Sequence, residues 1–243
     1  MEAFFLLIKI VFMQSMLRRF KFFGIGFVIG MIFVFFFFGN RGCSWLPGGR
    51  VKTTIAGKVI VVEENTLNKL AKKGVSKKDI LTVLNKGDVD FGSSKKQGNP
   101  QVYLIDGEVD GKKTSLWFTI PRDGFVSEVR IPEGNIQSAK NSTTGFAEMI
   151  HFPNVKAWVF VDPKPELNDG LTALDYGNEK EVQKALMKTG RIDFSKSNLL
   201  AEPNPEHYIV FKSKSNKILG TRCFWYQDHV KISNFFDETQ SSK

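Results

Sequence analysis

Side chains that carry acid–base, nucleophilic or metal chemistry are few in this chain and stand far apart. The three histidines, His151, His207 and His229, have no Cys, Asp or Glu at the spacing of a metal site. No Gly-x-Ser-x-Gly nucleophile motif occurs, and no glycine-rich phosphate loop precedes a helix. The sequence therefore predicts no catalytic residue, no metal ligand and no cofactor-binding residue.

Two clusters of charged residues could be functional or could simply face solvent. The acidic cluster consists of Asp88, Asp90, Asp106, Glu108 and Asp110. Paired carboxylates could hold a cation, but their alternation is more typical of the solvent-facing side of strands. The basic group, at 72–73 and 77–78, surrounds Gly74 and would suit lipid headgroups or an acidic partner.

The formal net charge is +9, and the residues after position 40 carry +6 of it (30 basic and 24 acidic groups), which is a mild excess. It favours weak attraction to anionic lipid or acidic glycan. Nucleic-acid binding is not expected, because the basic residues lack the interleaved aromatic residues of a single-strand groove. The two cysteines, Cys43 and Cys223, are too few for a disulfide scaffold, and we expect them not to pair.

Residues 22–38 (FFGIGFVIGMIFVFFFF) form an uncharged apolar run of 17 residues. This is the short end of a membrane-spanning helix, and no small-residue cleavage site follows. We expect an uncleaved single-pass anchor. The tighter basic cluster, Arg18, Arg19 and Lys21, precedes it and predicts a cytoplasmic segment at 1–21. The rest would then face the periplasm from the inner membrane of a bacterium.

Two further features belong to the N-terminal region. Residues 1–15 are apolar but interrupted by Lys9, and Met16 has the sequence context of a start, so 1–15 are interpreted as an over-long gene start. Gly26 and Gly30 lie on one face of the expected helix, a spacing that lets two helices approach closely. Either two anchors form a homodimer through these glycines, or the glycines are ordinary residues of a membrane helix.

The rest of the chain predicts an α+β fold of two small repeated modules, at 57–133 and 154–236. Each module is expected to pack short helices on an antiparallel sheet. Linkers are expected at 39–56 and 134–153, and a tail at 237–243.

Apolar periodicity and turn residues predict the elements of each module. In the first module they are a strand at 58–63, helices at 65–73 and 76–86, and strands at 101–109, 113–120 and 125–131. In the second they are a strand at 155–161, helices at 167–174 and 178–188, and strands at 192–194, 207–212, 218–226 and 230–236. Ser76 and Asp79 have the pattern of a capping box.

The repeat is clearest in 84–91 (LNKGDVDF) and 187–194 (MKTGRIDF). Each segment ends a helix at a glycine, Gly87 or Gly190, and enters a strand containing Asp-Phe. We expect each glycine to end its helix in the left-handed conformation. Further expected matches are Asn99-Pro100 with Asn204-Pro205, Tyr103 with Tyr208, and Trp117 with Trp225.

Residues 65–91 (NTLNKLAKKGVSKKDILTVLNKGDVDF) resemble the bacterial family called domain of unknown function 4258. Its members show His-Ala-x-x-Arg-Met-x-x-Arg-Gly-Ile-Ser, a helix ending in Asn-Gly or Lys-Gly, and then antiparallel strands. The resemblance covers about 57–133, with a diverged second copy at about 154–236. The anchor before such a domain is similar to proteins common in Bacteroidetes-type bacteria. The layout resembles the RelE-type toxin ribonucleases, which implies an α+β fold.

The chain departs from this family where the family's chemistry would reside. Asn65 stands at the histidine, and Lys69 and Lys73 stand at the two arginines. Asparagine cannot shuttle a proton, and lysine lacks the two-pronged contact of a guanidinium. Near the same places of the second copy lie Asp169, Ala173 and Asn178.

These observations favour a membrane-anchored envelope protein that acts by binding and not by catalysis. The expected partners are membrane lipid through the anchor, a second copy, and an envelope protein or acidic glycan. The alternatives are an enzyme of the RelE-like ribonuclease type and a structural subunit of an envelope complex.

Overall fold

The computed structural model describes residues 20–34, 46–122, 124–153, 157–161, 179–202, 204–226 and 229–238. The chain divides into two compact units, Met1–Gly49 and Arg50–Lys243. Each unit is described by itself.

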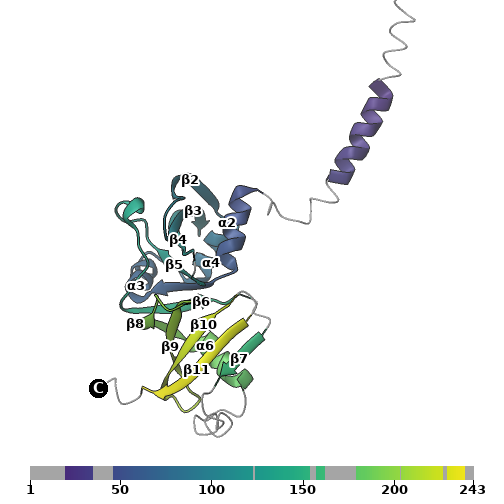
Figure 1. The fold of residues 1–243 in the computed structure, drawn as a ribbon. Helices are drawn as coiled ribbons and strands as arrows, with labels where there is room; N and C mark the ends of the chain where they lie inside the picture. The colour runs from purple at the N-terminus through teal and green to yellow at the C-terminus, as the bar shows by residue number, and fades with distance from the viewer. Residues whose placement is uncertain are drawn as a thin grey trace, which may run out of the picture. The chain divides into compact units, whose positions relative to one another are not determined.

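In the first unit, residues 20–34 form an α-helix, drawn in purple in Figure 1. Its apolar side chains are exposed, with Phe22 71% and Phe23 73% accessible. Across the described parts of the chain, no helix is both long and apolar enough to cross a membrane. The end of the expected anchor, 35–38, lies outside the described residues, so the anchor over 22–38 stays a prediction.

The second unit confirms the α+β class (Figure 1). Its helices are α2 (Pro47–Ala56), α3 (Glu64–Lys72), α4 (Lys77–Lys86) and α6 (Glu179–Thr189), with a short 3-10 helix η1 (Ile136–Ser138). Its strands are β1 (Val59–Glu63), β2 (Asp88–Lys95), β3 (Gln101–Val109), β4 (Lys112–Ile120), β5 (Val126–Arg130), β6 (Phe146–His151), β7 (Ala157–Val161), β8 (Arg191–Asn198), β9 (Glu206–Lys212), β10 (Ile218–Trp225) and β11 (His229–Asp237).

Most predicted elements are present within a few residues of their expected bounds, and the predicted capping box of Ser76 and Asp79 is present at the start of α4. The predicted helix at 167–174 lies outside the described residues. The expected linkers need correction, because 39–56 contains the whole of helix α2 and 134–153 contains η1 and strand β6.

Tertiary packing explains both corrections. Helix α2 (PGGRVKTTIA) has poor intrinsic helix propensity, but it buries Ile55 completely in the core beneath it. Strand β6 buries Ala147 and Met149 in one core and packs Ile150 against the other. Contacts with distant strands therefore order segments that look like linkers in the sequence.

The strands form one mixed sheet in the order β2-β3-β4-β5-β1-β6-β8-β9-β10-β11-β7. We call β1 to β5, with α3 and α4, the first half, and β7 to β11, with α6, the second half. Both halves have the same strand order, and in each the last pair is parallel, β5 with β1 and β11 with β7. Strand β6 joins them because it is antiparallel to β1 on one side and to β8 on the other (Figure 1).

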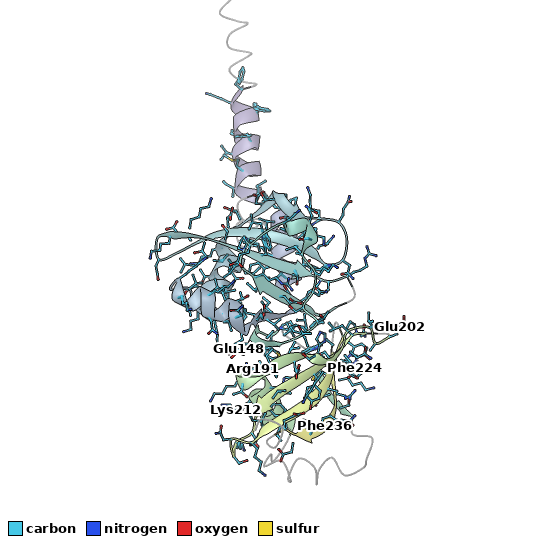
Figure 2. All side chains as sticks on the ribbon, turned by 90° about the vertical axis from the view of Figure 1, so that its left-hand side faces the viewer. Glu148, Arg191, Glu202, Lys212, Phe224 and Phe236 are labelled. Carbon is cyan, nitrogen blue, oxygen red and sulfur yellow. The ribbon has the colours of Figure 1, made fainter. Side chains whose placement is uncertain are left out.

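Ion pairs reinforce this junction. Glu148 of β6 lies opposite Arg191 of β8, and Figure 2 shows the two side chains close to one another. Glu148 also pairs with Lys77 of α4, and Arg191 Nη2 lies 2.6 Å from Glu64 Oε2 of α3. Helices of the first half therefore contact the joining strand β6 and the neighbouring strand β8 of the second half.

The helices of the two halves cover opposite faces of the sheet. On β1, Val59 and Val61 belong to the core that contains α6 residues. Ile60 and Val62 belong to the core that contains α3 and α4 residues. Because alternate side chains of a strand point to opposite faces, β1 separates the two cores.

The glycines at the two helix ends have a different role from the expected one. Gly74 after α3 is left-handed, with φ +80°. Gly87 has φ −69°, and Gly190 is also outside the left-handed region, so that expectation is wrong for both. A Cβ atom on Gly87 would lie 2.5 Å from Val83 O, and one on Gly190 would lie 2.3 Å from Leu186 O. Close packing, not backbone conformation, requires glycine there.

Strand register corrects the expected match of Tyr103 with Tyr208. Ser94 Oγ accepts a hydrogen bond from Leu104 N at 3.0 Å, and Ser197 Oγ accepts one from Tyr208 N at 2.9 Å. Tyr208 therefore takes the place of Leu104. A shift of one residue moves a side chain to the other face of a sheet.

The match of Trp117 with Trp225 is also displaced in register, by three residues. Trp117 lies opposite Leu104, whereas Arg222 lies opposite Tyr208. Arg222 therefore takes the place of Trp117. Trp225 instead packs in the large core of the second half.

Candidate functional site

Three cationic side chains converge on a hollow of about 440 Å³ in the first half. We call it the cationic hollow; its polar lining consists of Thr54, Lys58, Lys96, Gln97, Gln101 and Arg122. No Asp or Glu is among its described lining residues. The described ion pairs of the chain include none of its three cationic side chains.

Lys58 is the most enclosed of these cations. Its Nζ donates to Gly124 O at 2.6 Å and lies 5.9 Å from the centre of the Phe125 ring. Burial lowers the pKa of Lys58, because removal from water disfavours the charged form. An anion in the hollow would favour the charged ammonium and offset this effect.

Hydrogen bonds hold the other walls of the cationic hollow in place. Gln101 Nε2 donates to Lys96 O at 2.8 Å, which ties the β2–β3 loop to the start of β3. Arg122 N donates to Asn99 Oδ1 at 3.0 Å, which ties the same loop to the end of β4. The cations therefore come from three separate segments on a connected frame.

A second hollow, of about 590 Å³, lies beside α3, and we call it the polar groove. Its lining includes Asn65, Lys69, Trp117, Arg130, Asn141 and Ser142. Asn65 and Lys69 stand at positions of the resembled family's motif, and the structure brings them together here. Lys73 is not among the lining residues, and Asp169, Ala173 and Asn178 lie outside the described residues.

Two lining residues of the polar groove, Arg130 and Ser142, bind the buried carboxylate of Glu128. Glu128 is 6% exposed and accepts hydrogen bonds from Arg130 Nη2 at 2.6 Å and from Ser142 Oγ at 2.8 Å. By contrast, Lys69 Nζ pairs with Glu133 Oε2 at 3.0 Å on the exposed rim. The groove offers many hydrogen-bonding groups, and its described lining contains no histidine.

The three histidines lie in unrelated surroundings. His151 Nε2 lies 2.9 Å from Ala56 O, His207 is 4% exposed, and the ring of His229 stacks on Tyr226. Within the residues that the structure describes, no three His, Cys, Asp or Glu side chains gather as metal ligands would. Cys223 is a buried free thiol whose pKa is raised by burial.

Two residues of the acidic cluster, Asp90 and Asp106, make structural contacts. Asp90 Oδ1 accepts hydrogen bonds from Gly92 N at 2.8 Å and Ser93 N at 3.1 Å within its own strand. Ser115 Oγ donates to Asp106 Oδ1 across β3 and β4. The carboxylates of this region thus include two that are used within the sheet.

Sequence reasoning missed the cationic hollow. Lys58 precedes β1, Lys96 follows β2 and Arg122 follows β4, so they are far apart in the sequence. Lys58 and Arg122 are single basic residues at strand ends, and Lys96 belongs to a Lys-Lys pair; both patterns are common on protein surfaces. Only the sheet order brings these three ends together.

Comparisons with known proteins returned no match. No family model, no curated protein and no solved structure matches the chain. The resemblance of 65–91 to the domain of unknown function 4258 family stays a prediction.

Proposed function

We propose that this protein is a membrane-anchored envelope protein that binds an acidic glycan in the cationic hollow and does not catalyse a reaction. One observation carries the proposal: Lys58, Lys96 and Arg122 line one hollow whose described lining contains no carboxylate. The net charge of +9 supports attraction of an acidic ligand over longer distances.

The lining chemistry suits a sugar that carries carboxylate or phosphate groups. The three cations would bind the acidic groups through charge-assisted hydrogen bonds, which are stronger than neutral ones. Thr54, Gln97 and Gln101 also line the hollow and would serve sugar hydroxyls. Arg122 also offers the planar fork that fits a carboxylate.

The finer organisation of the fold is also a proposal. We infer that the modules 57–133 and 154–236 descend from one duplicated unit, because both halves have the same strand order. Ligand binding would belong to the first module. The residue that follows β2 is Lys96, whereas the residue that follows β8 is Leu199.

The anchor over 22–38 would hold the protein in the inner membrane with its modules in the periplasm. Contact of two anchors through Gly26 and Gly30 would give a homodimer. Protease added to cells with an opened outer barrier and an intact inner membrane tests the orientation. Digestion of residues 50–243 is expected, and their protection would contradict a periplasmic location.

A direct test uses the full chain in lipid nanodiscs and isothermal titration with tetragalacturonate, a linear acidic oligosaccharide. Saturable binding that weakens at high salt is expected, because partly exposed charges are screened. Uncharged maltotetraose, of equal length, should not bind. Equal binding of the two saccharides, or no binding of the acidic one, would contradict the proposal.

The alternative of a ribonuclease-type enzyme rests on the polar groove, where Lys69 and the guanidinium of Arg130 would hold phosphates although Asn65 cannot shuttle a proton. This alternative predicts cleavage of single-stranded RNA by the purified full chain. It also predicts that Lys69→Gln and Arg130→Gln abolish cleavage, while Lys96→Gln does not. Absence of any cleavage product would leave the binding function as the better account.

A further inference from the structure

A third hollow, of about 220 Å³, lies between the first and second halves, and we call it the inter-half pocket. Its walls include Val126 of β5, Phe194 of β8, Leu199 and Pro205, together with His207 and with Asn141, which also lines the polar groove. Leu200 lies at the same pocket and is 92% exposed, so a large apolar side chain stands at its rim.

Two polar atoms at this pocket have no hydrogen-bond partner within the described parts of the chain. They are His207 Nδ1 and Asn141 Oδ1. Both atoms are buried, and the whole His207 side chain is only 4% exposed. Buried polar groups almost always have a partner, so two unpaired atoms at one pocket point to a ligand that supplies hydrogen bonds.

The protonation of His207 defines what this ligand must offer. Burial lowers the pKa of His207 to about 4, so the ring is neutral at neutral pH. A neutral imidazole has one nitrogen that accepts a hydrogen bond, and an amide oxygen always accepts. Asn141 Oδ1, and His207 Nδ1 in the tautomer that leaves this nitrogen unprotonated, therefore need an N–H or O–H donor from the ligand.

The walls and charges of the pocket restrict the ligand further. The carboxylate of Glu128 also lines the pocket and already binds Arg130 and Ser142, which disfavours an anion. The apolar walls favour a largely apolar body. A cavity of about 150 Å³ can hold benzene, so the volume here suits a molecule of one or two fused rings.

We propose that the inter-half pocket binds a small, uncharged, largely apolar molecule with an N–H or O–H group that donates a hydrogen bond to His207; a second donor on the ligand would serve Asn141. This site is separate from the cationic hollow, whose lining selects an anion. The proposal does not depend on glycan binding, although Pro121 lines both hollows.

Indole is a suitable probe, because it has one N–H donor on an apolar ring system. The full chain, labelled with ¹⁵N-histidine, is placed in nanodiscs and titrated with indole while the ring nitrogens are observed by NMR. A saturable shift of the His207 signal is expected, beyond the change that lipid-partitioned indole causes at His151 and His229. No saturable shift at His207 would mean that water alone fills the pocket, and would overturn the proposal.

A second comparison needs no change in the protein. 1-Methylindole has nearly the same shape but no N–H donor, and we expect its affinity to be about tenfold lower, as for loss of one hydrogen bond in a buried site. Equal affinity of the two probes would overturn the assigned hydrogen bond.

Two variants complete the test. His207→Phe should abolish the saturable binding of indole, measured by its protection against thermal unfolding. His229→Phe is the matched control, because it changes a histidine outside the pocket, and it should keep the full response. Retained indole binding in a folded His207→Phe protein would contradict the assignment.

Discussion

Asp90 of β2 and Asp193 of β8 make the same hydrogen bonds in the two halves of the sheet. Asp193 Oδ1 accepts from Ser195 N at 2.9 Å and from Lys196 N at 3.3 Å, as Asp90 Oδ1 accepts from the amides two and three residues after it. In each half a serine four residues after the aspartate then donates to the aspartate's carbonyl oxygen. Each aspartate therefore fixes an irregular strand in its half.

Replacement of Asp193 by Ala should destabilise the protein more than replacement of Asp90 by Ala. Asp193 is 5% exposed, so Asp193→Ala leaves two amides without their acceptor and costs about 2 kcal/mol. Asp90 is more accessible, and water can replace its bonds. Urea unfolding of the full chain measures both changes, with Asp193→Asn as the control that keeps an acceptor oxygen. A larger loss for Asp90→Ala would contradict this prediction.

Gly190→Ala should destabilise the protein strongly. The new Cβ would lie 2.3 Å from Leu186 O and 2.0 Å from Met149 Cε, distances at which the backbone must shift. Overpacking of this kind costs about 1–3 kcal/mol. Gly57→Ala is the control, because its Cβ would lie 3.4 Å from Thr53 O in ordinary contact. Similar thermal stability of the two variants would show that the space at Gly190 is not tight.

Acid should destabilise the protein through His207. The pKa of this buried ring is lowered from 6.5 to about 4, so between these values the unfolded chain binds a proton that the folded chain does not. The folding stability is therefore fully present above pH 6.5 and falls as the pH approaches 4, by about 3 kcal/mol. Urea unfolding as a function of pH measures this slope. In His207→Phe the slope over this range should be much smaller, and an unchanged slope would assign it to other groups.

The ion pair of Glu128 and Arg130 should matter far more than that of Lys69 and Glu133. Glu128 is 6% exposed, and Arg130→Ala leaves its charge without the guanidinium, a change that costs about 3 kcal/mol. Lys69→Ala breaks an exposed pair and should cost less than about 1 kcal/mol. Unfolding by urea compares the two variants, and equal losses would contradict the structural assignment.

The parts of the fold that could be predicted from the sequence depend on neighbours in the chain. Ser76 and Asp79 predict the start of α4 because both groups of a capping box lie within one turn. The hairpin of β3 and β4 follows from Asp110-Gly111, where both residues have positive φ. In the second half, strands β9 and β10 were predicted from apolar periodicity and turn residues in the same way.

The parts that could not be predicted depend on contacts between distant segments. Strand β6 pairs with β1 and β8, which are far from it in sequence, and no local pattern indicates such partners. The paired matches of tyrosine and tryptophan failed because spacing cannot detect a shift in register, of one residue for tyrosine and three for tryptophan. The cationic hollow was missed for a similar reason, because its three cations follow or precede different strands.

The most direct test of acidic-glycan binding compares two double variants of equal charge. Lys96→Gln with Arg122→Gln removes two cations from the hollow, and Lys112→Gln with Lys113→Gln removes two from exposed positions where β4 begins. Titration of full-length protein in nanodiscs with tetragalacturonate should show at least about tenfold weaker binding for the first variant, since each contact contributes about 1 kcal/mol. The second variant should stay close to the unmodified protein. Equal weakening by both variants would mean that only the net charge attracts the ligand, and would contradict a binding site in the cationic hollow.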